Sequence, residues 1–209
     1  MSANRNALRQ IVRDYVSAFE RLLFELDLAV LQQVVDRLRA VRDSGATVYI
    51  AGNGGSSATA SHWANDLGKA TKTSGQRPIR VMSLSDNVSW LTALANDEGY
   101  ERVFSGQLEN FANPGDVLVV ISASGNSSNL IQAVNVARER GIVTIGLLGF
   151  DGGLLKDKVD ISILLRTEKG QYGLVESAHS LVCHILAECL AKDRHGTVGN
   201  DRAQLATMR

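Results

Sequence analysis

The sequence predicts an α/β protein with a three-layer, doubly wound parallel sheet of five strands, preceded by a helical extension. Two observations lead to this fold class. From residue 44 onward, short apolar segments of strand length alternate with segments of helical periodicity, and the connections between them are short. The first and third apolar segments each run into a turn rich in glycine and serine, at the end of the strand where parallel sheets bind ligands.

Residues 1–43 are expected to form helices that pack on the domain and at a subunit interface. Apolar residues recur there at helical spacing in two stripes. The first stripe contains Ile11, Tyr15, Phe19, Leu22, Leu23 and Leu26, and the second contains Leu31, Val34, Val35, Leu38 and Val41. The later helices already cover the two faces of a sheet, so we expect part of this apolar surface at an interface.

Residues 44–192 are expected to form the sheet domain. Strands are predicted at 47–51, 79–84, 117–121, 142–148 and 161–165; the third has five consecutive apolar residues, typical of a strand buried on both faces. Helices are predicted from the first turn through residue 67, near 88–95 and 101–111, up to about residue 140, and from about 173 to 192. Residues 193–209 are polar, and we expect a loose C-terminal tail there.

Composition excludes several classes of function. Twenty-two basic residues balance 22 acidic ones, which gives no general attraction to nucleic acid or to an anionic membrane. The sequence predicts no transmembrane span, and its first residues lack the apolar core of a signal peptide. Cys183 and Cys189 point to different faces of a predicted helix and are not expected to bond each other, so we expect a reduced, cytoplasmic setting.

The turn after the third predicted strand is the most informative segment for function. Ser122, Ser124, Ser127 and Ser128 lie within seven residues, between a strand and a helical pattern. Free N–H groups of a first helical turn, serine hydroxyls and the helix dipole all favour a bound anion, and a phosphate is the expected ligand. The alternative is that Ser127 or Ser128 only caps the helix and the other serines are solvated.

The turn after the first predicted strand, residues 52–57, reads Gly-Asn-Gly-Gly-Ser-Ser. Its glycines let the backbone approach a ligand closely, and its serines can donate to phosphate oxygens. The serine-rich turn is neither a Walker A sequence nor Gly-x-Gly-x-x-Gly, so a nucleotide-dependent enzyme is disfavoured. A single sugar phosphate fits the two turns better.

Several motifs together resemble the sugar isomerase (SIS) fold and, within it, the phosphoheptose isomerases. They are Gly52-Asn-Gly-Gly-Ser56, His62, Asn96-Asp97, Ser122-Ala-Ser-Gly-Asn-Ser127, and Glu176 with His184, and the likeness covers roughly residues 5–192. The resemblance implies a five-stranded flavodoxin-like sheet and a homotetramer with active sites shared between subunits. It also implies conversion of D-sedoheptulose 7-phosphate to D-glycero-D-manno-heptose 7-phosphate through an enediol.

Residue roles carry over from this family position by position. The phosphate contacts correspond to Ser122, Ala123, Ser124 and Ser127, and the other substrate contacts to Asn53, Gly54, Gly55, Ser56, Asn96, Asp97 and Glu176. The zinc ligands of the family, for one ion per subunit, correspond to His62, Asp66, Glu176 and His184. Two of these positions depart from the family pattern, because Asp66 stands where the family has Glu and Glu176 where it has Gln.

The residue types by themselves are consistent with isomerisation. His62 and Asp66, four residues apart, share one face of a helix, and Glu176 and His184 share one sector of the last helix. Ketose–aldose isomerisation needs a base that moves a proton between C1 and C2 and an acid for the oxygens. We expect Asp66 as the base and His184 as the acid, and the exchange of the base role with Glu176 stays open. Two histidines and two carboxylates are also a credible zinc set.

The alternative function is a non-catalytic SIS module that binds a sugar phosphate and acts as a regulator or binds a protein partner. The departures at Asp66 and Glu176 favour this alternative, whereas the presence of both histidines and two carboxylates argues against it. His179 is expected to be structural or to support the site, and His195 to be exposed in the tail. Four aromatic residues are expected in the core or at subunit contacts: Trp63, Trp90, Phe104 and Phe111.

Overall fold

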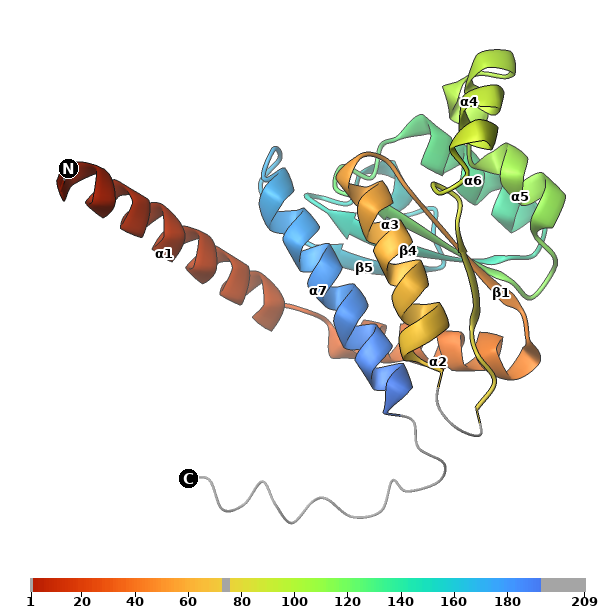
Figure 1. Cartoon of the computed structure of the whole chain (residues 1–209), viewed down its shortest axis with the longest axis horizontal. Coiled ribbons are helices and arrows are strands. Elements are labelled where there is room, and N and C mark those ends of the chain that lie inside the picture. Colours follow the sequence, from red (N-terminus) through yellow and green to blue (C-terminus); the bar gives the residue numbers. More distant parts are fainter. Residues whose placement is uncertain (1, 73–75, 193–209) are drawn as a thin grey trace, which may run out of the picture.

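The computed structural model describes residues 2–72 and 76–192 (Figure 1). Within these residues, five parallel strands form one sheet in the order β2-β1-β3-β4-β5. The strands are β1 (Thr47–Gly52), β2 (Arg80–Ser83), β3 (Val117–Ser122), β4 (Val143–Gly149) and β5 (Ile161–Leu165). The doubly wound parallel sheet predicted from the sequence is therefore confirmed, and the chain reverses its direction of winding between the neighbouring strands β1 and β3.

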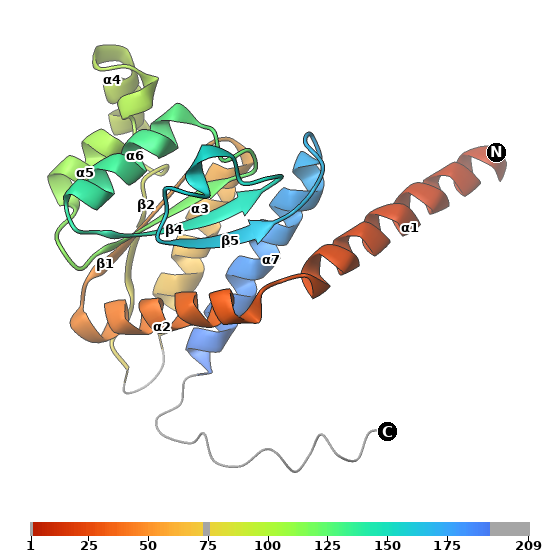
Figure 2. The same ribbon diagram turned by 180° about the vertical axis from the view of Figure 1, so that it is seen from behind.

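Helices cover both faces of the sheet, as Figures 1 and 2 show from opposite sides. One face carries α2 (Leu28–Ser44), α3 (Gly55–Asn65) and α7 (Tyr172–Ala191), and the other carries α4 (Val88–Asp97), α5 (Ser105–Phe111) and α6 (Ser128–Glu139). Alternate residues of β3 divide between two cores, with Val119 packing under α2, α3 and α7 and Val120 under the opposite layer. The apolar run of β3 is thus buried on both faces, as its composition predicted.

The N-terminal region forms two helices, α1 (Ser2–Phe24) and α2, separated at Asp27. The Asp27 side chain caps α2 by accepting from the backbone N–H groups of Ala29 and Val30. All five residues of the second predicted stripe are buried, whereas the first stripe has only Leu22 buried, and α1 extends away from the sheet (Figure 2). Exposed apolar side chains on α1 include Leu8, Ile11, Val12, Tyr15 and Val16.

The structure departs from the predicted element boundaries at two places that matter for the site. The helix expected through residue 67 changes at Asp66 into a π-helical turn, η1 (Asp66–Ala70), in which the N–H of Thr71 bonds the Asp66 carbonyl. The helix expected at 101–111 begins as a separate 3₁₀ turn, η2 (Tyr100–Arg102). A second 3₁₀ turn, η3 (Gly153–Leu155), follows β4. The predicted tail, with His195, lies outside the described residues.

Of the described helices, α7 alone has the length and apolar content that a membrane span would need, and half of it is buried inside the fold. Its apolar residues pack in the core beneath the sheet, as in the core helices of soluble proteins. Among the aromatic residues, Trp63 and Phe104 are buried, as expected. Trp90 and Phe111 contact each other edge to face, with ring centroids 5.0 Å apart.

Candidate active site

The two glycine- and serine-rich turns lie side by side at the carboxyl ends of β1 and β3, where the winding of the sheet reverses. Between them is a pocket of about 180 Å³. It is lined by Asn53, Ser56, Ile121, Ser122, Ala123, Ser124, Ser127, Tyr172 and Glu176. The structure thus brings the four predicted phosphate contacts together with Asn53, Ser56 and Glu176, and it adds Ile121 and Tyr172, which the sequence motifs did not single out.

The serine-rich turn presents unused hydroxyl hydrogens to this pocket. The Ser122 hydroxyl oxygen accepts from the N–H of Gly125 at 3.0 Å, and the Ser124 oxygen accepts from the N–H of Asn126 at 3.3 Å. Ser127 occupies the N-cap position of α6, yet its hydroxyl makes no capping bond. Each of the three hydroxyls therefore has a hydrogen without an acceptor among the described residues, so the turn is suited to an anion, and Ser127 does not act as a side-chain cap.

A close backbone contact fixes the shape of this turn. Gly125 has φ +64°, and a Cβ there would lie 1.9 Å from the carbonyl oxygen of Gly152 in the turn after β4. The Gly125 carbonyl in turn accepts from the N–H of Leu155 at 3.0 Å. The turn is therefore held against its neighbour through backbone atoms.

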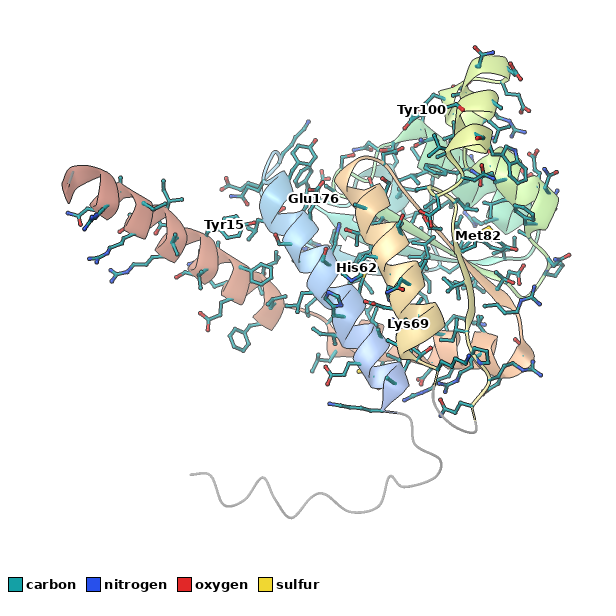
Figure 3. All side chains as sticks on the ribbon, viewed as in Figure 1. Tyr15, His62, Lys69, Met82, Tyr100 and Glu176 are labelled. Carbon is teal, nitrogen blue, oxygen red and sulfur yellow. The ribbon has the colours of Figure 1, made fainter. Side chains whose placement is uncertain are left out.

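The helices α3 and α7 run parallel to each other, starting beside the pocket between the two turns, which we call the phosphate pocket after its predicted ligand. At their N-terminal ends, an ideal Cβ on Gly55 would lie 2.7 Å from the carboxyl atoms of Glu176. One turn further along, the hydroxyls of Thr59 and Ser180 are 3.4 Å apart. The absence of a side chain at Gly55 is what leaves room for the Glu176 carboxylate beside the pocket, and Figure 3 shows Glu176 near the start of α7.

Further along the same helix pair, His62, Asp66 and His184 form a cluster. Oδ2 of Asp66 is 3.1 Å from Nδ1 of His184 and 3.6 Å from Nε2 of His62. The two imidazole rings meet edge to face with centroids 4.9 Å apart. The histidine side chains are about half exposed, at 56% and 48%, whereas Asp66 between them is 16% exposed.

The cluster fits a metal ion by donor type and by spacing. One nitrogen or oxygen from each residue lies within 4.8 Å of the others. Ligands about 2.0–2.1 Å from a tetrahedral zinc ion are roughly 3.4 Å apart, close to the two measured separations. Glu176 lies outside this cluster, because eight residues separate it from His184, or about 12 Å along a helix.

Two buried groups on α7, Cys183 and His179, have strongly shifted pKa values. Burial, and secondarily the charge of Asp66, raises the pKa of the Cys183 thiol, so the thiol stays protonated next to His184. Burial lowers the pKa of His179 to about 4, and this effect outweighs an opposing one from the Leu148 backbone. Neither ring nitrogen of His179 makes a hydrogen bond within the described part of the chain. His179 is a neutral core residue.

Four predicted substrate contacts do not line the pocket, namely Gly54, Gly55, Asn96 and Asp97. Asn96 and Asp97 end α4, where both are exposed and the Asn96 amide donates to the Asp97 carboxylate at 2.7 Å. Gly54 is exposed, with φ +54°, and a Cβ placed on it would meet no described atom within 4 Å. Their roles as substrate contacts stay predictions.

This arrangement is typical of an α/β protein that binds a sugar phosphate. The two glycine- and serine-rich turns form the pocket, and the ionisable cluster lies further along the helices α3 and α7. The SIS domain family matches residues 13–149. The phosphoheptose isomerase of Trichlorobacter lovleyi is 37% identical over 186 residues, covering 88% of this chain and 92% of the relative. The structure of the phosphoheptose isomerase of Neisseria gonorrhoeae has a TM-score of 0.79 at 29% identity and covers 89% of this chain and 97% of that chain.

A second structure, the phosphoheptose isomerase of Francisella tularensis, has a TM-score of 0.78 at 25% identity, covering 88% of this chain and 96% of that chain. The chain belongs to the SIS domain family and, within it, to the phosphoheptose isomerases. The resemblance drawn from the sequence motifs is confirmed.

Proposed function

We propose that this chain interconverts D-sedoheptulose 7-phosphate and D-glycero-D-manno-heptose 7-phosphate. The observation that carries the proposal is the position of the phosphate pocket and of the His62–Asp66–His184 cluster along one pair of parallel helices. The pocket binds the phosphate, and the cluster lies where the other end of an extended sugar would reach. The family relationship supports the same activity.

The separation between the two parts suits a long sugar phosphate. Eight residues of α7 separate Glu176, which lines the pocket, from His184 in the cluster, about 12 Å along the helix axis. An extended chain advances roughly 1.2 Å per bond, so the phosphorus of a seven-carbon 7-phosphate lies roughly 10 Å from C1. A five-carbon ketose phosphate is shorter by roughly 2.4 Å on the same scale. We therefore expect the seven-carbon substrate to be preferred.

The proposed reaction moves one proton between two carbons. Asp66 removes a proton from C1 of the ketose and returns it to C2, while His184 protonates the C2 oxygen and accepts the proton that leaves the C1 hydroxyl. The C1–H bond breaks, a C2–H bond forms, and the carbonyl moves from C2 to C1. The 3.1 Å contact between Asp66 and His184 supports this pair, because it holds the imidazole in a fixed orientation beside the base.

We further propose that the cluster holds one zinc ion per subunit. His62, Asp66 and His184 would be its ligands. Glu176 is the fourth residue of the family set, but in the described chain it lies outside the cluster, beside the pocket. When bound, zinc would act as a Lewis acid on the sugar oxygens. Because Asp66 would then be a ligand, Glu176 is the alternative base, as the sequence leaves open.

We propose a homotetramer in the cytoplasm. The apolar side chains that α1 leaves exposed supply the surface for another subunit. The half-exposed histidines of the cluster are consistent with a site that a neighbouring subunit completes.

The test is incubation of the purified protein with sedoheptulose 7-phosphate while a new aldose phosphate is monitored, with added zinc and after chelation. We expect turnover that chelation lowers and zinc restores. Absence of turnover with this and other C5–C7 ketose phosphates would contradict the proposal. The rival, a non-catalytic sugar-phosphate module, predicts tight binding without deuterium exchange at C1 or C2 in heavy water.

A further inference from the structure

Three side chains outside the proposed chemistry meet at the edge of the phosphate pocket. The amides of Asn53 and Asn129 exchange two hydrogen bonds, each 2.9 Å long, with each Nδ2 donating to the other Oδ1. The hydroxyl of Tyr100 donates to the same Oδ1 of Asn53, also at 2.9 Å. Asn53 follows β1, Asn129 lies in the first turn of α6, and Tyr100 begins η2, so three separate segments converge on one amide.

These bonds use almost all of the hydrogen-bonding capacity of Asn53. An asparagine side chain offers two lone pairs on its oxygen and two hydrogens on its nitrogen. Asn129 and Tyr100 occupy both lone pairs of Asn53, and Asn129 takes one of the two hydrogens. The second hydrogen has no acceptor within the described residues, and Asn53 lines the pocket. Asn53 therefore faces the ligand as a donor of one hydrogen bond.

We propose that Asn129 and Tyr100 are positioning residues that lock the Asn53 amide as a one-hydrogen donor to an acceptor oxygen of the bound sugar phosphate. This inference rests on the proposed function for the identity of the ligand. Neither Asn129 nor Tyr100 lines the pocket, so both act through Asn53. Released from them, the Asn53 amide can rotate and present its oxygen, which repels a phosphate or carbonyl oxygen.

Burial separates the roles of the two positioning residues. Asn129 is 1% exposed, and its reciprocal pair with Asn53 joins the turn after β1 to the helix that follows the phosphate turn after β3. Tyr100 is 60% exposed and is labelled in Figure 3 near α4. Because the Tyr100 ring is not part of the core, removal of its hydroxyl takes one hydrogen bond from the Asn53 amide and leaves the packing of the core intact.

The experiment is a double-mutant cycle on the full chain, read as the Kd for sedoheptulose 7-phosphate by calorimetry, with KM, kcat and the thermal midpoint measured in parallel. Tyr100→Phe should raise Kd two- to tenfold, the effect of one neutral hydrogen bond, without a change in thermal midpoint. In an Asn53→Ala background the same substitution should leave Kd unchanged, because the amide that it positions is gone.

A second variant and a control complete the test. Asn129→Asp can still accept from Asn53 but cannot donate to it, and we expect a Kd increase of at least tenfold. Tyr49→Phe is the matched control: it removes a 3.0 Å bond from a tyrosine hydroxyl to the Phe111 carbonyl, away from the pocket. It should lower the thermal midpoint and leave Kd unchanged.

An unchanged Kd in Tyr100→Phe, or an equal effect of Tyr100→Phe with and without the Asn53 side chain, overturns the inference even if Asn129→Asp fails to fold. A wild-type protein that binds the sugar phosphate without converting it refutes the isomerase proposal, and the Kd cycle still decides this one. A wild-type protein that binds no sugar phosphate overturns both.

Discussion

Replacement of Gly55 by alanine tests whether the position of the Glu176 carboxylate matters for turnover. Gly55 is the first residue of α3, and a Cβ there would lie 2.7 Å from the Glu176 carboxyl carbon and from both of its oxygens. Ordinary van der Waals contact begins at 3.4 Å, so the carboxylate must retreat by about 0.7 Å (3.4 − 2.7) to restore it. The atoms displaced are the far end of a flexible side chain, so the backbone can stay in place.

The expected loss falls on catalysis and not on folding. Gly55 is not among the described glycines with positive φ, and alanine is a better helix former than glycine, so we expect an unchanged or raised thermal midpoint. A displacement of about 1 Å in an active site can lower the rate by about 100-fold. We therefore expect kcat/KM to fall roughly ten- to a hundredfold, or about 1.4–2.7 kcal/mol in transition-state stabilisation.

The assay is steady-state conversion of sedoheptulose 7-phosphate, with Gly173→Ala as the matched control. Gly173 lies in the first turn of α7, and a Cβ there would meet only the Tyr15 hydroxyl, at an ordinary 3.5 Å. We expect this control to retain wild-type kinetics. Wild-type kcat/KM in Gly55→Ala would refute the reasoning, because the carboxylate would then have no role that depends on its position.

Three other predictions concern the phosphate turn, the base and the buried histidine. Ser124→Ala removes a hydrogen bond to a charged group, so KM should rise roughly ten- to a hundredfold; an unchanged KM counts against this phosphate contact. Asp66→Asn should keep substrate binding and lose most turnover, and if Glu176→Gln alone does so, the base role belongs to Glu176. Burial lowers the pKa of His179 to about 4, below the ordinary 6.5, so the unfolded chain takes up this proton first as the pH falls. The wild-type protein should therefore lose stability from pH 6.5 to 4, and urea unfolding at pH 7 and pH 4.5 should show a smaller loss in His179→Leu; equal losses would contradict the buried, neutral state.

The sheet and the phosphate turn were predictable because their signals are local. Five consecutive apolar residues at Val117–Ile121 define a strand buried on both faces, and the serines that follow predict an anion site at a helix N-terminus. Parallel strands then bring the two turns to one edge of the sheet. The pocket is the spatial consequence of two short sequence patterns.

The relations between distant side chains were less predictable. Asn129 looks in the sequence like an ordinary polar residue in a first helical turn, and its pairing with Asn53 spans 76 positions of the chain. Glu176 and His184 share a sector of one helix, but they are eight residues apart along it. Glu176 therefore lies beside the phosphate pocket, and His184 lies in the cluster with His62 and Asp66. Periodicity identifies a shared face but does not place residues along it relative to another helix.

The half-exposed histidines of the cluster and the exposed apolar side chains of α1 together predict that turnover depends on the association of subunits. A single chain forms the phosphate pocket from its own two turns, whereas the side chains of His62 and His184 remain about half exposed. Low-dielectric surroundings strengthen electrostatic catalysis, so a neighbouring subunit that covers these histidines would raise the rate. Ile11, 64% exposed on α1, lies in the apolar stripe that would cover a neighbouring subunit.

Ile11→Glu should therefore lower the assembly state and abolish turnover while the Kd for inorganic phosphate stays within twofold. Gln33→Glu, which adds the same charge to an exposed position of α2, is the matched control and should change neither. Light scattering and specific activity measured over a dilution series give both readouts. A 22.5 kDa wild-type species that retains full specific activity would show that one chain completes the site and that α1 has another role.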